Sequence, residues 1–379
     1  MPSDRSNWMS LTRRWRVATV AGASLASVGL CAATSGLPAD VQMRVSNAAA
    51  AWLGSLDKAQ RSEALYELQD EERFDLRLAP ILLEGLRRDE MSDSQWLGWR
   101  AVLAEGLSPP GLAKVEAVMS LERELAILGR GGFFGSLLGG FITGEERYYV
   151  ALFGEPAPDR VWGLRFDGHH VSLNWTVMPD GKVAATPVFL GSQPREIPKG
   201  LDRAGLRVLR EEEDAGLALW QALDETQRTK SELPFAAGSW TGNRPLFVGE
   251  GGEPLDLAAP VGISYAEMTV EQKQRFDELL GVYVARFAKP LREVYVAKID
   301  AAGRGALHFS WAGSLQPGKP GYYRIQGRTL LIELDNTLEA ADHVHTIVRD
   351  LDNDFGRDLL AEHYARHHRV ASRERSERQ

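Results

Sequence analysis

The stretch from residue 322 to residue 350 reads YYRIQGRTLLIELDNTLEAADHVHTIVRD, and it decides the fold prediction. Apolar and polar residues alternate along it with the period of two that is typical of β-strands. Gln326-Gly327 and the segment 336–342 interrupt this alternation, which predicts three antiparallel strands joined by two turns. One face of the resulting sheet is therefore expected to be apolar and the other polar.

Side chains that alternate along a strand sort onto opposite faces of the sheet. The predicted core face collects Tyr323, Ile325, Leu330, Ile332, Leu334, Val344 and Val348. The predicted polar face collects Tyr322, Arg324, Glu333, Asp335, His343 and His345. A two-residue turn at 326–327 would pair Arg324 with Thr329 and Tyr322 with Leu331. Symmetric closure of the next hairpin would pair Glu333 with His345 and Asp335 with His343.

An earlier segment, RFDGHHVSLNWT at residues 165–176, has the same pattern around Asp167-Gly168. A two-residue turn there predicts a hairpin in which Arg165 faces His170. The apolar side is predicted to carry Leu164, Phe166, Val171, Leu173 and Trp175, and the polar side Arg165, His170, Ser172, Asn174 and Thr176.

The two stretches belong to a longer internal match. Residues 149–176 align without gaps to residues 308–335, which lie 159 positions later. Upstream, 56–61 resembles 223–228, and 91–95 resembles 268–272, where both copies carry a Ser/Thr-x-x-Gln helix-capping box. We therefore predict an α+β fold made by tandem duplication of a helices-then-antiparallel-strands unit, with the two halves related by a pseudo-twofold axis.

The expected organisation follows from this match and from helical apolar spacing. It comprises an export signal at 1–39, a first repeat at 40–200, a second repeat at 201–350, a C-terminal helix at 351–371 and a charged tail at 372–379. The first repeat is expected to hold helices within 46–128, a glycine-rich loop at 129–144 and strands within 148–190. The second is expected to hold helices within 211–300 and strands within 306–349. The glycine-rich loop could be a mobile flap or an ordinary surface insertion.

Composition narrows the class of protein. The 379 residues are 44% hydrophobic and 25% charged, which is ordinary for a globular chain. The formal net charge of −8 argues against a nucleic-acid partner, which requires a basic surface. No phosphate-binding loop and no nucleotide or flavin motif is present in the sequence.

Arg13, Arg14 and Arg16 precede an uncharged run from Val17 to Ala33, the pattern of a secretory signal. The run is rich in small residues, which favours cleavage over anchoring, so no stable membrane span and a periplasmic or secreted location are expected. The arginine pair allows either twin-arginine export or an ordinary signal. Cys31, the single cysteine, lies inside this signal, so a cleaved chain would have no disulfide and no cysteine metal ligand.

The polar face of the second sheet carries the candidate site. Two imidazoles beside two carboxylates suit Zn, Fe or Mn, so His343, His345, Glu333 and Asp335 are the predicted metal ligands. Glu333, Asp335 and Arg324 are the predicted catalytic residues of a metal-dependent hydrolase acting on a small-molecule substrate.

Two other interpretations remain open. The chain could be a metal-free periplasmic binding protein for a small polar or anionic ligand, with Arg165 and Arg324 as anchors. In either case Arg165, His170, Tyr322 and His308 are candidate binding residues, although a structural, hydrogen-bonded role suits His308 better. Alternatively, the polar face is simply solvated, as is common in antiparallel sheets, and the protein is structural or an interaction module.

Four segments together resemble one family. They are RFDGHHVSLNWT, HFSWAG at 308–313, YYRIQG at 322–327 and LDNDFGRDLLAEHYARH at 351–367. The chain is identified by them as a member of the bacterial and fungal family labelled domain of unknown function 3500, over most of residues 45–370. The resemblance implies an export signal but no activity. It also implies a shared role for seven residues, which are His169, His170, His308, Arg324, Asp335, His343 and His345. Gly321 and Leu334 depart from the family pattern, in which His and Tyr are usual.

Overall fold

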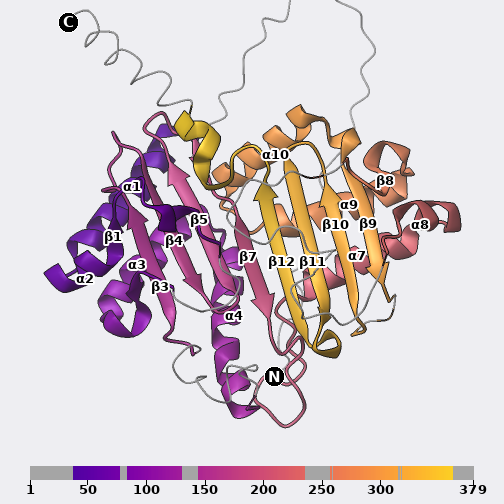
Figure 1. The fold of residues 1–379 in the computed structure, drawn as a ribbon, viewed down its shortest axis with the longest axis horizontal. Helices are drawn as coiled ribbons and strands as arrows, with labels where there is room; N and C mark the ends of the chain where they lie inside the picture. The colour runs from indigo at the N-terminus through magenta and orange to yellow at the C-terminus, as the bar shows by residue number, and fades with distance from the viewer. Residues whose placement is uncertain are drawn as a thin grey trace, which may run out of the picture. The chain divides into compact units, whose positions relative to one another are not determined.

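A computed structural model describes residues 37–76, 83–129, 144–234, 257, 259–314, 316 and 318–361. The expected export signal lies almost entirely outside these residues, as do most of the glycine-rich loop, the end of the C-terminal helix and the charged tail. Within the described part, helices and one large mixed sheet give an α+β fold (Figure 1).

Twelve strands form a single sheet with the order β1-β3-β4-β5-β7-β12-β11-β10-β9-β8, while β2 pairs with β3 and β6 with β5. Their bounds are β1 Leu65–Tyr66, β2 Leu86–Arg87, β3 Tyr148–Phe153, β4 Trp162–Gly168, β5 Val171–Val177, β6 Val183–Ala184, β7 Val188–Ser192, β8 Ile263–Ser264, β9 His308–Gly313, β10 Gly321–Gln326, β11 Leu330–Leu338 and β12 His343–Asp350. The antiparallel pair β7–β12 joins the strands of the earlier part of the chain to those of the later part.

Helices pack on the apolar face of this sheet. Their bounds are α1 Ala39–Gly54, α2 Lys58–Ala64, α3 Asp93–Gly106, α4 Pro109–Ile127, α7 Arg210–Ala222, α8 Glu225–Ser231, α9 Val270–Val284 and α10 Lys289–Gly303. Both predicted capping boxes are confirmed, because Ser92 and Thr269 accept hydrogen bonds from the backbone N–H of Gln95 and Gln272. None of the described helices is long and apolar enough to span a bilayer.

The predicted division into faces is confirmed on the apolar side. All seven predicted core residues of the later strands and all five of the earlier hairpin lie in one buried cluster with the helices. The polar side chains of the opposite face are buried as well: Tyr322 and Glu333 are fully buried, and His345 is 3% exposed. A smaller apolar cluster that includes Leu76 and Phe355 lies on this second face. The expectation of a simply solvated polar face is therefore wrong.

The register expected for the first hairpin is wrong by four residues. Arg165 pairs with Asn174 rather than with His170, and Gly168 lies inside β4 instead of in the turn. A side chain on Gly168 would collide with the ring of Tyr148 on β3. Close packing requires glycine at this position. The Asp167-Gly168 pair therefore resembles a turn in sequence although it lies at the end of a strand.

The later strands repeat this error. Arg324 pairs with Glu333 rather than Thr329, and Tyr322 pairs with Asp335 rather than Leu331. Gly327 is again a packing glycine, because a Cβ there would lie 2.5 Å from a methyl group of Leu307.

The last hairpin, β11–β12, is displaced by two residues. Asp335 pairs with His345 instead of His343, and Glu333 pairs with Ile347 instead of His345. An irregularity between Asp335 and Leu338 changes the register, so that His343 pairs with Leu338. Where the pairing is regular, the displacements are even, and therefore those side chains stay on their predicted faces. His343 is displaced by three residues beyond the irregularity, but it shares the face of His345, which lies two residues away on the same strand.

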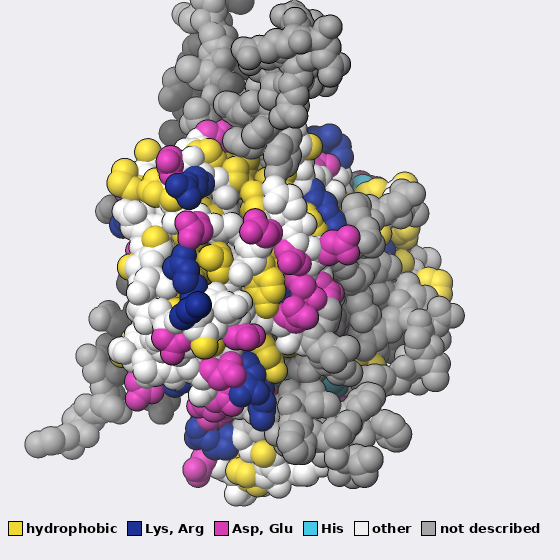
Figure 2. Space-filling model, turned by 60° about the vertical axis from the view of Figure 1, so that its left-hand side comes forward, with side chains coloured by type: hydrophobic (Ala, Val, Ile, Leu, Met, Phe, Trp, Pro, Cys, Tyr) yellow, Lys and Arg dark blue, Asp and Glu magenta, His cyan; other side chains and the backbone are white. Residues whose placement is uncertain are grey.

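The face formed by the N-terminal helices is an ordinary solvated surface. Figure 2 shows acidic and basic side chains interspersed on it. Arg44 illustrates the pattern, since it contacts both Asp40 and Glu105 in ion pairs. Such exposed pairs contribute little to stability.

Candidate metal centre

His170 reaches the site from the turn between β4 and β5. Because Gly168 pairs with Val171, the two residues between them form the turn. His170 has φ +64°, a left-handed conformation that residues other than glycine rarely adopt. Its carbonyl oxygen accepts a 2.8 Å hydrogen bond from the N–H of Gly191, which holds the turn against β7.

Gly191 makes room for the ring of His170. A Cβ at this position would lie 2.5 Å from His170 Cδ2 and 2.7 Å from its Cγ. Gly191 is also the cross-strand partner of His345 on β12. A residue with no side chain at this point therefore lets His170 lie over β7 and reach the neighbouring strand.

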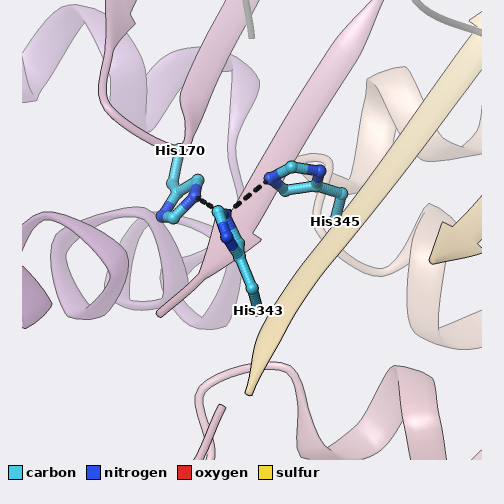
Figure 3. A group of neighbouring side chains, drawn as sticks. All are labelled: His170, His343 and His345. Atoms are coloured by element: carbon cyan, nitrogen blue, oxygen red, sulfur yellow. Dashed lines mark hydrogen bonds between the residues drawn. The ribbon is translucent and has the colours of Figure 1, made fainter. Parts of the chain in front are cut away.

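His343 and His345 come from the start of β12. Being two residues apart on one strand, they point to the same face of the sheet. Figure 3 shows the three rings converging, His170 from one side and the other two from β12. His343 Nε2 lies 2.7 Å from His170 Nε2 and 3.0 Å from His345 Nε2. One ligand atom from each residue lies within 4.8 Å of the other two, and all three residues are buried.

Hydrogen bonding alone does not account for this convergence. An imidazole nitrogen carries either one hydrogen or one lone pair. His343 Nε2 can therefore make only one proper hydrogen bond, although two other Nε2 atoms lie at hydrogen-bond distance. A cation at the point where the three nitrogens meet would use all three lone pairs at once.

The ionisation state of His170 suits metal binding. Burial lowers the pKa of His170 well below its ordinary value, and the neighbouring His169, His343 and His345 lower it further. The ring is therefore neutral at pH 7, and a neutral imidazole is the form that ligates metals.

Backbone strain concentrates at the same place. Six described residues other than glycine have positive φ, and four of them are His170 and the three residues 339–341, which precede β12. The remaining two are Arg203 and Phe355. Strained conformations persist where surrounding structure enforces them, and they cluster at functional sites. The two turns that present the histidines are thus the most strained part of the described backbone.

One carboxylate lies beside a ring of the group, and a second contacts the neighbouring His169. Glu339 Oε1 is 3.4 Å from His343 Nδ1, and Gln193 Nε2 donates a 2.5 Å hydrogen bond to Glu339 Oε2. The ring of His169 stacks on that of His170 with centroids 3.9 Å apart, and His169 Nδ1 contacts the buried carboxylate of Glu122. Carboxylates behind ligating histidines are typical of metal centres.

The predicted carboxylate ligands do not join the histidines. Among the described residues, the group with metal-ligand spacing contains neither Glu333 nor Asp335. Glu333 accepts a 2.5 Å hydrogen bond from the Tyr322 hydroxyl, which in turn accepts one from Arg324 Nε at 2.7 Å. Asp335 lies beside His345 across the strand pair and accepts a hydrogen bond from the backbone N–H of Thr337.

The other predicted binding residues lie elsewhere. Arg165 is buried, with Asp167 Oδ2 2.8 Å from its Nε and Glu72 Oε2 3.0 Å from its Nη1, so its charge is matched within the chain. His308 lies on β9, which β10 and β11 separate from β12. Its Nδ1 is 2.9 Å from the carbonyl oxygen of Ala306, as a structural histidine would be.

The sequence pattern predicted His170 as a binding residue but not as a metal ligand, and it pointed to no role for Gly191 or Glu339. The pairing of β7 with β12 is a contact between distant parts of the chain, and it leaves no local signal. The adjacent pair His169-His170 at a hairpin turn was a usable signal, but the wrong register placed His170 within a strand.

The chain belongs to the family described as protein of unknown function (DUF3500), whose match covers residues 39–357. Comparison with the curated proteins and with the solved structures finds no match.

Proposed function

We propose that this protein binds a divalent transition metal through His170, His343 and His345. The single observation that carries the proposal is the convergence of three buried Nε2 atoms, with 2.7 Å and 3.0 Å between neighbours. Each neutral imidazole offers one nitrogen lone pair, and a metal ion at this point would accept one from each of the three rings.

Zinc is the metal that this ligand set favours most. Zn²⁺ binds imidazole nitrogen readily and tolerates three protein ligands. Iron and manganese are the alternatives, and manganese is the weaker one because it prefers oxygen ligands. Copper binds most nitrogen sites more tightly than zinc, so it has to be excluded by measurement.

A metal-dependent hydrolase is the activity that we propose for this centre. Structural zinc sites have four protein ligands, whereas catalytic ones have three and leave a position open. A metal ion held in this way supplies Lewis-acid chemistry and an activated water. Asp335, beside His345 across the strand pair, is the proposed general base. Arg324, hydrogen-bonded to Tyr322, is the proposed partner of an anionic group on a small-molecule substrate.

Elemental analysis tests metal binding. The wild-type protein, purified without added metal, should hold about one equivalent of zinc, iron or manganese, and the His343→Ala/His345→Ala variant should hold none. His308→Ala is the matched control, because it removes a histidine from β9, three strands away from β12 in the same sheet, and should keep the metal. Equal metal content in the double variant and the control would refute the proposal. Metal-free wild-type protein that melts at the same temperature with and without chelator would also refute it.

A second variant tests whether the position of His170, and not only its presence, is needed for metal binding. Gly191→Ala keeps all three histidines but puts a methyl group where the ring of His170 lies. We expect its metal affinity to fall at least tenfold while His308→Ala is unaffected. Hydrolysis of a panel of ester and phosphoester substrates, abolished by chelator and restored by one equivalent of zinc, would support the enzymatic part. Full metal content without any such activity would support metal binding and refute the proposed hydrolase activity.

Tandem duplication is also proposed, and the strand bounds support it. Strands β3, β4 and β5 recur 159 positions later as β9, β10 and β11 to within one or two residues at their ends. Leu107 and Phe287, which follow α3 and α9, bridge to each other in antiparallel fashion, as residues beside a twofold axis would.

The glutamines of the helix caps give independent support. Gln60 and Gln95 exchange side-chain hydrogen bonds of 3.1 Å and 2.7 Å, and Gln227 and Gln272 do the same with the same two distances. In a crystal structure of the protein, superposing the first set of strands on the second should require a rotation near 180°. A rotation far from that value would argue against a twofold relationship.

Export is proposed from the N-terminal sequence alone. The arginines followed by an uncharged run of small residues are the feature that supports it. N-terminal sequencing of the protein from a periplasmic or culture fraction should find a start near residue 34 or 40. Recovery of the uncut chain from the cytoplasm would contradict export.

A further inference from the structure

We infer that Glu339 is a positioning residue for His343, and that it fixes the tautomer in which His343 Nε2 is free to bind the metal. This inference rests on the proposed metal centre. It concerns a residue outside the ligand set, on the turn that precedes β12.

A carboxylate lies on the Nδ1 side of the His343 ring. Glu339 Oε1 lies 3.4 Å from His343 Nδ1, whereas the opposite nitrogen, Nε2, faces His170 and His345. Gln193 Nε2 donates to the other carboxylate oxygen at 2.5 Å, so the Glu339 side chain is itself held in place from β7 and the residues that follow it.

The chemistry follows from the tautomers of imidazole. A carboxylate only accepts hydrogen bonds, so it favours the His343 tautomer that carries hydrogen on Nδ1. That tautomer leaves the lone pair on Nε2, where the metal would bind, and the adjacent negative charge makes the ring a stronger ligand. The 3.4 Å contact is longer than a good hydrogen bond, and such contacts commonly shorten once the site is filled.

Backbone strain is a separate observation that points to the same residue. Glu339 has φ +48°, and the next two residues, Ala340 and Ala341, have φ +57° and +73°. Three consecutive residues other than glycine in the left-handed region are unfavourable, because their Cβ atoms crowd the backbone there. The conformation brings the carboxylate back onto His343, four residues later, which gives the strain a function.

Cobalt-substituted protein tests the inference. Co²⁺ replaces zinc in nitrogen sites and shifts the exchangeable imidazole N–H signals of its ligands out of the normal proton NMR range. Wild type should show one such signal for each of the three histidines. Glu339→Gln should bind Co²⁺ about 10- to 100-fold more weakly. It should also move one N–H signal and speed its exchange with water, leaving the other two unchanged.

Glu196→Gln is the matched control. It also removes one negative charge, but from Glu196, which follows β7, is 52% exposed and forms an ion pair with Arg195 at 3.9 Å. Glu339→Asp keeps the charge and should recover part of the affinity. If wild type binds cobalt through three histidines and Glu339→Gln matches it in affinity and in all three N–H signals, the positioning role is refuted and the metal centre stands. If wild type binds no cobalt, the metal centre itself fails. Thermal melting of the metal-free variants separates either result from misfolding.

Discussion

Two groups of buried polar side chains on this sheet differ in whether their members can satisfy one another. Around Arg165, one guanidinium is matched by the carboxylates of Asp167 and Glu72 at 2.8 Å and 3.0 Å. In the metal centre, His170, His343 and His345 turn the same kind of atom toward a common point. The first group holds opposite charges that pair with one another within the chain. The second presents three like atoms to one point and could hold a metal ion there.

The largest effect should come from breaking the Arg165 group. Arg165→Met leaves the carboxylate of Asp167 buried without its cation, which should lower the free energy of unfolding by about 4 kcal/mol. Urea denaturation measures this, and adding Asp167→Asn should recover part of the loss. The loss should be the same with and without zinc. A loss below about 1 kcal/mol would mean that the Arg165 group contributes little to the stability of the fold.

Zinc should stabilise the folded protein through the histidine group and not through the Arg165 group. At free zinc one hundred times its dissociation constant, the free energy of unfolding should rise by about 3 kcal/mol. This gain should disappear in His170→Ala and persist in His308→Ala, as measured by thermal or urea unfolding in zinc buffers. An equal gain in His170→Ala would place the bound zinc elsewhere.

The next largest effect should be a pH dependence of stability that comes from the Arg165 group. Burial raises the pKa of Asp167 to about 6, although Arg165 opposes the shift. The folded state therefore binds the extra proton, and the resulting stability is fully present below pH 4 and is lost as the pH rises through 6. Asp167→Asn cannot ionise, so the stability of wild type relative to this variant should fall by on the order of 2 kcal/mol between pH 4 and pH 7. An unchanged difference, measured in chelator by urea unfolding, would contradict the shift.

The smallest effect should come from relieving strain beside the histidines. Ala340→Gly suits φ +57° and should raise the free energy of unfolding by up to about 1 kcal/mol. The same substitution at the exposed helical residue Ala104 should lower it by a similar amount. If Ala340→Gly is as destabilising as Ala104→Gly in urea unfolding, the turn before β12 is not strained.

The faces of the sheet were predictable from sequence, whereas its registers were not. Alternation alone fixes which side chains share a face, and the slips in the regular parts of all three hairpins are even-numbered, so they left the faces intact. Registers failed because Gly168 and Gly327 look like turn residues but are packing glycines beneath Tyr148 and Leu307. Local sequence cannot distinguish these two uses of glycine.

The candidate site was predictable only in part, for a related reason. His343 and His345 share a strand, so their common face follows from the alternation of side chains. Their third partner, His170, comes from a turn 173 residues earlier, through the pairing of β5, β7 and β12. The alternation of apolar and polar residues along a strand carries no information about such a long-range contact. The sequence therefore favoured Glu333 and Asp335, the polar residues nearest in the strand pattern, which instead lie outside the histidine group.

Anomalous diffraction from crystals grown with zinc tests the central claim most directly. The account predicts one strong peak at the zinc edge, about 2.0–2.1 Å from Nε2 of each of His170, His343 and His345. A crystal in which these three nitrogens surround no anomalous peak, while zinc is fully bound at other residues or not at all, would contradict it.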